Sequence, residues 1–119
     1  MNWYLVKIVY RIICGEGNHT AQFDEQVRLV TATDEQEAMQ KGNYIGLQEE
    51  ETFRNDKQQL VQWQFVNVTE IYALTNMTDG AEVCSQIKET DDAEAYCSFA
   101  HHKAAMLRKN FPSFTLQIV

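Results

Sequence analysis

The sequence is poor in residues that break or cross-link a fold. It contains one proline, five glycines and three cysteines among 119 residues. The cysteines are odd in number, widely spaced and form no CxxC pair. This excludes a disulfide-stapled scaffold and predicts free thiols in a reducing compartment, with Cys14 and Cys84 buried in strands. No low-complexity tract or linker divides the chain, so we expect a single domain over residues 1–119.

Long apolar runs and positive charge are also scarce. Lys7 and Arg11 interrupt the apolar N-terminal stretch, and no small-residue cleavage site follows it. No stretch approaches the roughly 18 apolar residues of a membrane span. Ten basic against seventeen acidic side chains give a net charge of −7, which repels phosphate backbones and anionic lipids. We therefore expect a cytoplasmic protein that binds neither nucleic acid nor a membrane.

Alternating apolar residues predict strands at the start of the chain. Residues 3–14 place Tyr4, Val6 and Ile8 on one side, the period-two pattern of a strand with one face on a core. A second alternating stretch covers about residues 21–32. The glycines of the turn between them predict that the two strands pair as an antiparallel hairpin.

The period then changes to that of a helix over residues 35–53, followed by a return loop at 54–59. Thr33 or Asp34 can cap this helix, because Gln36 and Glu37 stand three residues on, as a capping box requires.

A long strand is expected at residues 61–74, and its apolar phase slips between Phe65 and Val66. A β-bulge would leave this pattern, and so would a strand buried on both faces. A turn at Asp79-Gly80, a fourth strand over about 81–89 and a helix over 91–111 follow. The tail at 113–119 alternates again, which allows a short last strand. The fold class is therefore α+β: a two-layer, mostly antiparallel sheet with two helices, in the order ββαββα(β).

Several short motifs resemble a small bacterial family, domain of unknown function 4288. The resemblance covers about residues 3–86 and lies in Trp3-Tyr4, Phe23-x-Glu25, Ala32, Glu37-Ala38, Trp63-x-Phe65, Val68-x-Glu70-x-Tyr72-x-Leu74, Asp79-Gly80 and Glu82-Val83-x-Ser85. Asn67 and Cys84 depart from the glycine and tyrosine expected at those two positions. The resemblance implies a bacterial, cytosolic protein and carries no mechanism.

Two carboxylates stand inside predicted strands, Glu25 and Glu70. Paired carboxylates in an apolar pocket can separate their pKa values into an acid and a base. This gives one hypothesis, a small-molecule-binding or hydrolytic site. Solvated or ion-paired glutamates are commoner, so we expect a partly buried, structural Glu70 that meets Lys7, Arg11, Arg28 or a tyrosine hydroxyl.

A metal site has weaker support. Cys97 and His101 are four residues apart on one face of a predicted helix, which suits two ligands, whereas zinc needs three or four. A third ligand such as His19 would have to come from elsewhere in the chain. We therefore expect no metal and no cofactor.

The aromatic and apolar surface leads to the main hypothesis. The sequence offers more large apolar side chains than two helices can cover, and exposed apolar patches usually mark partner sites. We expect a homodimer or docking to another protein rather than an enzyme. The candidate interface residues are Trp3, Trp63, Phe65, Tyr72, Phe114 and Ile118.

Overall fold

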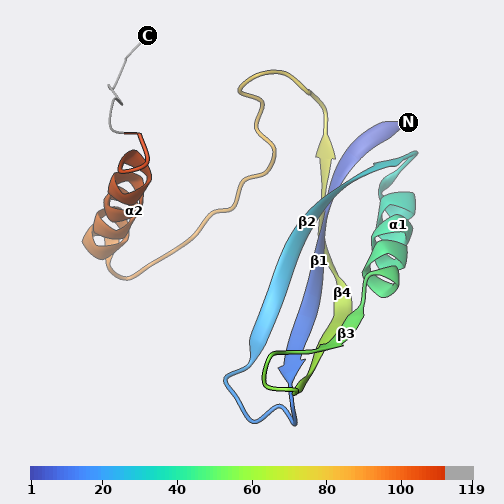
Figure 1. Ribbon diagram of the computed structural model, residues 1–119. Coiled ribbons are helices and arrows are strands. Elements are labelled where there is room, and N and C mark those ends of the chain that lie inside the picture. The colour runs from blue at the N-terminus through green and yellow to red at the C-terminus, as the bar shows by residue number, and fades with distance from the viewer. Residues whose placement is uncertain (112–119) are drawn as a thin grey trace. The chain divides into compact units, whose positions relative to one another are not determined.

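The computed structural model describes residues 1–111 (Figure 1). It separates into two units, Met1–Cys84 and the part that begins at Ser85, and each is described by itself. The first unit coincides closely with the family-like core expected at residues 3–86. The single domain expected over residues 1–119 stays a prediction.

The first two strands form the predicted hairpin. β1 (Asn2–Cys14) pairs antiparallel with β2 (Gln22–Ala32) in one unbroken register. The chain reverses through a turn in which Gly15 and Gly17 adopt positive φ values of 60° and 82°. Residues other than glycine rarely adopt this backbone conformation, so the glycines allow the tight reversal.

Helix α1 (Glu35–Gln48) begins where the sequence predicts and ends earlier. Asp34 caps it by accepting a 2.8 Å hydrogen bond from the backbone N–H of Glu37, as the capping signal indicates. The predicted continuation to residue 53 is wrong. Three glutamates at 49–51 follow the helix, and negative charge is unfavourable at the negative end of the helix dipole.

Phe53 instead lies in a short strand that the sequence analysis missed. β3 (Glu51–Arg54) pairs antiparallel with β4 (Leu60–Leu74), and the loop expected at 54–59 is the turn of this second hairpin. Asn55 organises the turn, because its side-chain oxygen accepts hydrogen bonds from the backbone N–H groups of Lys57 and Gln59.

All four strands form one antiparallel sheet in the order β2-β1-β4-β3. Of the two alternatives for the phase slip in β4, the structure shows the bulge, since Val66 has no partner in the register between β1 and β4. Thr69 is left out of the same register, so β4 carries a second bulge. The two bulges keep Phe65, Val68 and Ile71 on one face of the sheet, packed in or against the core.

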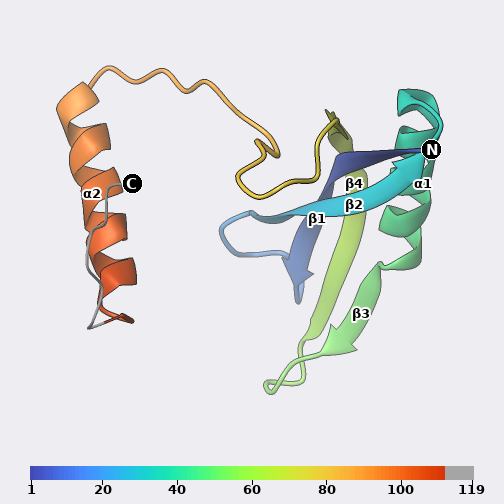
Figure 2. The same ribbon diagram turned by 90° about the horizontal axis from the view of Figure 1, so that it is seen from above.

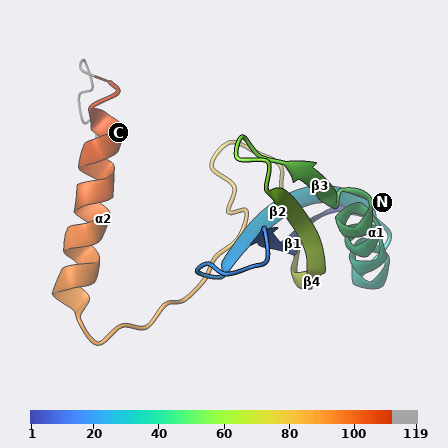
Figure 3. The same cartoon turned by 60° about the horizontal axis from the view of Figure 1, so that its bottom comes forward.

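The core lies between α1 and that face of the sheet. α1 contacts β1, β2 and β4 (Figures 2 and 3). It can approach closely because Gly42 and Gly46 are buried against the side chains of Val68 and Phe65. The buried core residues are Tyr4, Val6, Ile8, Tyr10, Val30, Ala32, Ala38 and Val68.

In the second unit, residues 85–111 contain one helix, α2 (Ala93–Arg108), where the sequence predicts it. Asp92 caps it by accepting a 2.9 Å hydrogen bond from the N–H of Ala95. The strand predicted over 81–89 is wrong: this segment has no regular structure. Its few apolar residues stand among charged and polar ones, too sparse to secure a strand. None of the helices within residues 1–111 is long and apolar enough to cross a membrane.

Candidate functional site

The sheet has one face that α1 does not cover, which we call the open face. Successive strand residues point to opposite sides, so the register assigns to the open face the residues Trp3, Leu5, Lys7, Val9, Phe23, Glu25, Val27, Leu29, Glu70, Tyr72 and Leu74. Four large apolar side chains there are exposed, by 43% for Trp3, 55% for Phe23, 54% for Val27 and 47% for Leu29. The alternating apolar residues of β2, Phe23, Val27 and Leu29, therefore face away from α1.

Lys7 joins the two strand carboxylates at the centre of the open face. Its Nζ lies 2.7 Å from Oε1 of Glu25 and 3.1 Å from Oε2 of Glu70. These two carboxylates, Glu25 first, raise the pKa of Lys7 above its ordinary value. The Tyr72 hydroxyl donates a 2.8 Å hydrogen bond to Oε1 of Glu70. The ammonium thus bridges the two carboxylates, a different arrangement from an acid and base that share a proton.

Glu70 has the kind of partner that the sequence predicts, a lysine on the neighbouring strand and a tyrosine hydroxyl. Its side chain is 31% exposed, which agrees with the predicted partial burial. The face predicted for one neighbour is wrong. Strict alternation puts Val68 beside Glu70, whereas the bulge at Thr69 turns Val68 into the core, where it is 7% exposed.

The predicted interface residues fall into three groups. Trp3 and Tyr72 lie on the open face. Trp63 and Phe65 pack against the core on the α1 side, so Trp63 shares no face with Glu25 or Glu70. The remaining two, Phe114 and Ile118, lie outside the described residues, as does the predicted final strand.

A pocket of about 340 Å³ lies on the α1 side of the sheet, beside the C-terminal end of the helix. It combines aromatic and charged side chains from β1, β2, β3 and β4 and the end of α1. The lining residues are Tyr10, Asp24, Gln26, Arg28, Glu49, Glu51, Phe53 and Trp63.

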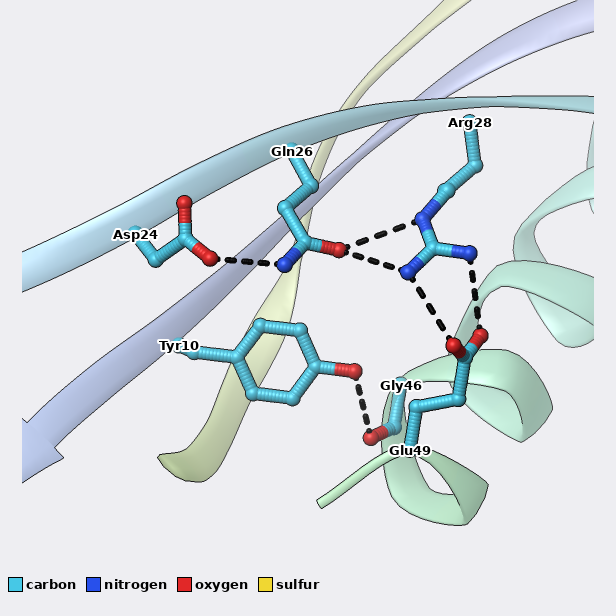
Figure 4. Close-up of polar contacts among 6 residues, drawn as sticks. All are labelled: Tyr10, Asp24, Gln26, Arg28, Gly46 and Glu49. Atoms are coloured by element: carbon cyan, nitrogen blue, oxygen red, sulfur yellow. Dashed lines mark hydrogen bonds and ion pairs between the residues drawn. The ribbon is translucent and has the colours of Figure 1, made fainter. Parts of the chain in front are cut away.

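A chain of polar contacts runs along one side of this pocket (Figure 4). Gln26 donates a 2.6 Å hydrogen bond to Oδ2 of Asp24, and its own side-chain oxygen accepts from Nε and Nη2 of Arg28 at 3.1 and 2.8 Å. The guanidinium also meets both carboxylate oxygens of Glu49, at 3.0 and 3.2 Å. Arg28, expected as a partner for Glu70, therefore ties β2 to the end of α1.

Aromatic side chains form the rest of the lining. The Trp63 indole donates a 3.2 Å hydrogen bond to Oδ2 of Asp24 and stacks on Phe53 with 6.0 Å between ring centroids. The Tyr10 hydroxyl donates to the backbone carbonyl of Gly46 at 2.9 Å (Figure 4). Burial, with a further contribution from the Glu49 carboxylate, raises the pKa of Tyr10.

The sequence analysis did not identify this pocket. Asp24, Gln26 and Arg28 alternate along β2, and this polar row was the available signal. Alternation alone cannot tell which side of the strand meets the helix, because both rows of β2 mix polar with apolar residues. The other lining residues come from β3, which is not predicted from the sequence, and from the end of α1, which is predicted too far along the chain.

The residues proposed as a metal site lie in different units. Cys97 and His101 belong to α2, while His19 lies in the turn after β1. Nε2 of His19 accepts a 3.0 Å hydrogen bond from the N–H of Cys14. Within residues 1–111, no group of three His, Cys, Asp or Glu side chains is placed to hold a metal ion.

Comparison with known proteins gives one match. The model of the family described as "Domain of unknown function (DUF4288)" matches residues 3–85. No curated protein and no solved structure matches the chain.

Proposed function

The chain belongs to the DUF4288 family, whose description assigns no activity. We propose that it is a protein-interaction module that forms a homodimer through the open face of its sheet. The observation that carries the proposal is the exposure of Trp3, Val27 and Leu29 together on that face. Contiguous exposed apolar side chains favour association, because burying them removes apolar surface from water.

Apolar residues are most numerous at one end of the open face, while Val9 and Phe23 lie toward its other end. In the register, Trp3 lies beside Leu74, and the next row contains Leu5, Leu29 and Tyr72. The charged cluster around Lys7 occupies the row that follows. An interface centred on Leu5 would bury the apolar rows and leave the charges at its edge, which matches the apolar core and polar rim of known interfaces.

A second copy of the chain suits this surface in shape. Sheets pack well face to face with other sheets about 10 Å apart, and an identical sheet supplies a matching apolar end.

The test is the mass of the particle in solution, measured by light scattering and sedimentation over a range of concentrations. Wild-type protein should approach twice the chain mass as concentration rises. Leu29→Lys should stay monomeric with an unchanged circular dichroism spectrum, because Leu29 is already half-exposed. Leu47→Lys is the matched control: Leu47 is 59% exposed on α1, and this change should leave the dimer intact.

Two results would overturn the proposal. One is a wild-type protein that remains monomeric at every concentration. The other is a dimer that survives Leu29→Lys as well as it survives Leu47→Lys, since the interface would then lie elsewhere.

We also propose a bacterial cytoplasmic location, as the family resemblance implies. Cys14, Cys84 and Cys97 are free thiols, and two of them are exposed. Exposed free thiols suit a reducing compartment, because an oxidising one would pair or modify them. Expression in the cytoplasm and in the periplasm, followed by thiol counting, tests this: loss of free thiols in the periplasmic protein is the expected result.

A further inference from the structure

The pocket on the α1 side has the size of a small-molecule site. Its volume of about 340 Å³ falls within the range of roughly 300–1,000 Å³ that ligand pockets occupy. It lies over the sheet beside the end of α1, and all four strands contribute to its lining. It opens on the opposite side of the sheet from the open face, so it is available whether or not the open face is covered.

The pocket carries more negative than positive charge. Asp24, Glu49 and Glu51 line it together with a single cation, Arg28. Arg28 is bound to Glu49 at 3.0 Å, so that pair is neutral overall. Asp24 accepts hydrogen bonds only from the uncharged groups of Gln26 and Trp63 among the described contacts.

Glu51 makes no ion pair within residues 1–111. Two carboxylates, those of Asp24 and Glu51, are therefore left without a cation in a pocket whose guanidinium is already engaged. An anionic ligand would meet this surplus of negative charge, whereas a cationic ligand would neutralise it.

The aromatic lining favours an organic cation over a metal ion. Trp63 and Phe53 stack on one another and both line the pocket. Aromatic faces attract ammonium groups through the ring quadrupole, and they also cover the apolar chain that an organic cation carries. Metal ions of the zinc or calcium type need several ligands in a closed arrangement, which two carboxylates do not supply.

We propose that this pocket binds a small organic diamine, whose two ammonium groups interact with Asp24 and Glu51 while its carbon chain lies against Trp63 and Phe53. The presence of two uncompensated carboxylates favours a diamine over a monoamine. The proposal does not depend on dimerisation, because it concerns the other side of the sheet.

The experiment follows the indole N–H signal of Trp63 by two-dimensional NMR of the full chain at low salt. Three four-carbon compounds serve as probes: 1,4-diaminobutane, the neutral 1,4-butanediol and the anionic succinate. A Trp3→Phe variant identifies the Trp63 signal, since these are the two tryptophans of the chain. We expect a saturable shift with the diamine and none with the diol or succinate.

Variants connect the shift to the pocket. Asp24→Asn with Glu51→Gln should weaken diamine binding by about tenfold or more, because both charges that attract the ammonium groups are lost. Asparagine can still accept the hydrogen bonds of Gln26 and Trp63, so the fold should persist. Glu35→Gln, a charge removed from the start of α1 outside the pocket, should change the affinity little.

Three results would overturn the proposal. The diol could shift the signal as much as the diamine does. Sodium chloride at equal ionic strength could produce the same shift. The double variant could bind the diamine as tightly as the wild-type protein.

Discussion

Lys7 Nζ lies 3.1 Å from the carboxylate of Glu70 on the open face of the sheet, and Tyr72 donates a hydrogen bond to the other carboxylate oxygen. Glu70→Gln should be mildly destabilising, because the amide oxygen can still accept from Lys7 and the amide NH2 can donate to the Tyr72 hydroxyl, without the charge. Glu70→Ala should cost more, because it also removes the acceptor for Lys7 and Tyr72. Urea denaturation of both variants measures the difference.

Glu16→Ala, at an exposed carboxylate in the β1–β2 turn, is the control and should leave the free energy of unfolding unchanged. Equal losses for the two Glu70 variants would contradict a role in accepting hydrogen bonds.

The Tyr10 hydroxyl satisfies a carbonyl at the end of α1. Gly46 is among the last four residues of the helix, whose carbonyls lack the usual helical partner. Tyr10→Phe should therefore lower the free energy of unfolding by about 1–2 kcal/mol, the cost of leaving a buried acceptor unsatisfied. Tyr44→Phe is the matched control, because Tyr44 is 62% exposed on the same helix; it should cost much less. A cost for Tyr10→Phe no larger than the control would contradict the assigned role.

The same tyrosine should make the protein sensitive to alkali. Burial raises the pKa of Tyr10 above its ordinary value of 10.0, so the unfolded chain loses this proton at a lower pH than the folded chain does. The stabilisation is complete below pH 10 or so and declines as pH rises through the folded pKa. Lys7, whose pKa is also raised, acts in the same direction.

Thermal melts between about pH 9 and pH 12 measure this effect. The Tm of the wild-type protein should fall more steeply with pH than that of Tyr10→Phe, in which Lys7 and the other tyrosines still titrate. Parallel curves for the two proteins would show that Tyr10 does not contribute.

Gly46 is where α1 approaches the sheet most closely. A Cβ atom there would overlap the ring of Phe65, whereas at Gly42 it would meet Val68 Cγ2 at 2.9 Å. Alanine normally stabilises a helix relative to glycine by about 1 kcal/mol. At position 46 overpacking should outweigh this gain and give a net loss of about 1–3 kcal/mol.

A double variant separates the two effects. Adding Phe65→Leu to Gly46→Ala should recover part of the loss, because leucine lacks the outer ring atoms. If Phe65→Leu costs as much in the Gly46→Ala background as in the wild-type protein, the two residues are not coupled and the packing explanation fails.

The three thiols should react at different rates. The sequence analysis expects Cys14 and Cys84 to lie buried in strands, which is wrong for Cys84, since it is exposed and outside any strand. Cys14 is half-buried in β1, with Nδ2 of Asn55 at 3.6 Å from its sulfur. Labelling with a thiol reagent should be fast at Cys84 and Cys97 and slower at Cys14, and unfolding in urea should abolish the difference. Equal native rates at all three sites would contradict the packing around Cys14.

Local signals in the sequence predict the local parts of the fold. The β1–β2 hairpin, the Asp34 cap and the bulge at Val66 each depend on residues close together in the chain. β3 was missed because a four-residue strand with one apolar side chain, Phe53, shows no alternation. Residues 81–89 contain the apolar pair Val83 and Ile87 at a spacing compatible with a strand, yet nothing pairs with them among the described strands.

The candidate site depends on contacts between residues of different strands and the helix. For Glu70 the sequence offers Lys7 only as one of three candidate cations, with Arg11 and Arg28, because it does not give the order of the strands. The pocket around Arg28 could not be predicted from the sequence, because its lining residues come from separate elements and meet only when the strands pair in the correct register. Whether Asp24 or Glu25 faces the helix depends on which side of β2 the helix covers. The residues of β2 by themselves do not determine that side.

Each of the two bulges of β4 inserts one extra residue into the strand. The bulge at Thr69 changes which parity of residue number faces α1, and the bulge at Val66 restores it three residues earlier in the chain. Deleting either bulge residue alone should therefore leave every other side chain on its face, because Phe65 and Asn67, like Val68 and Glu70, already point to opposite sides of the sheet. β4 can lose one residue at either position and still keep Trp63, Phe65, Val68 and Ile71 facing the helix.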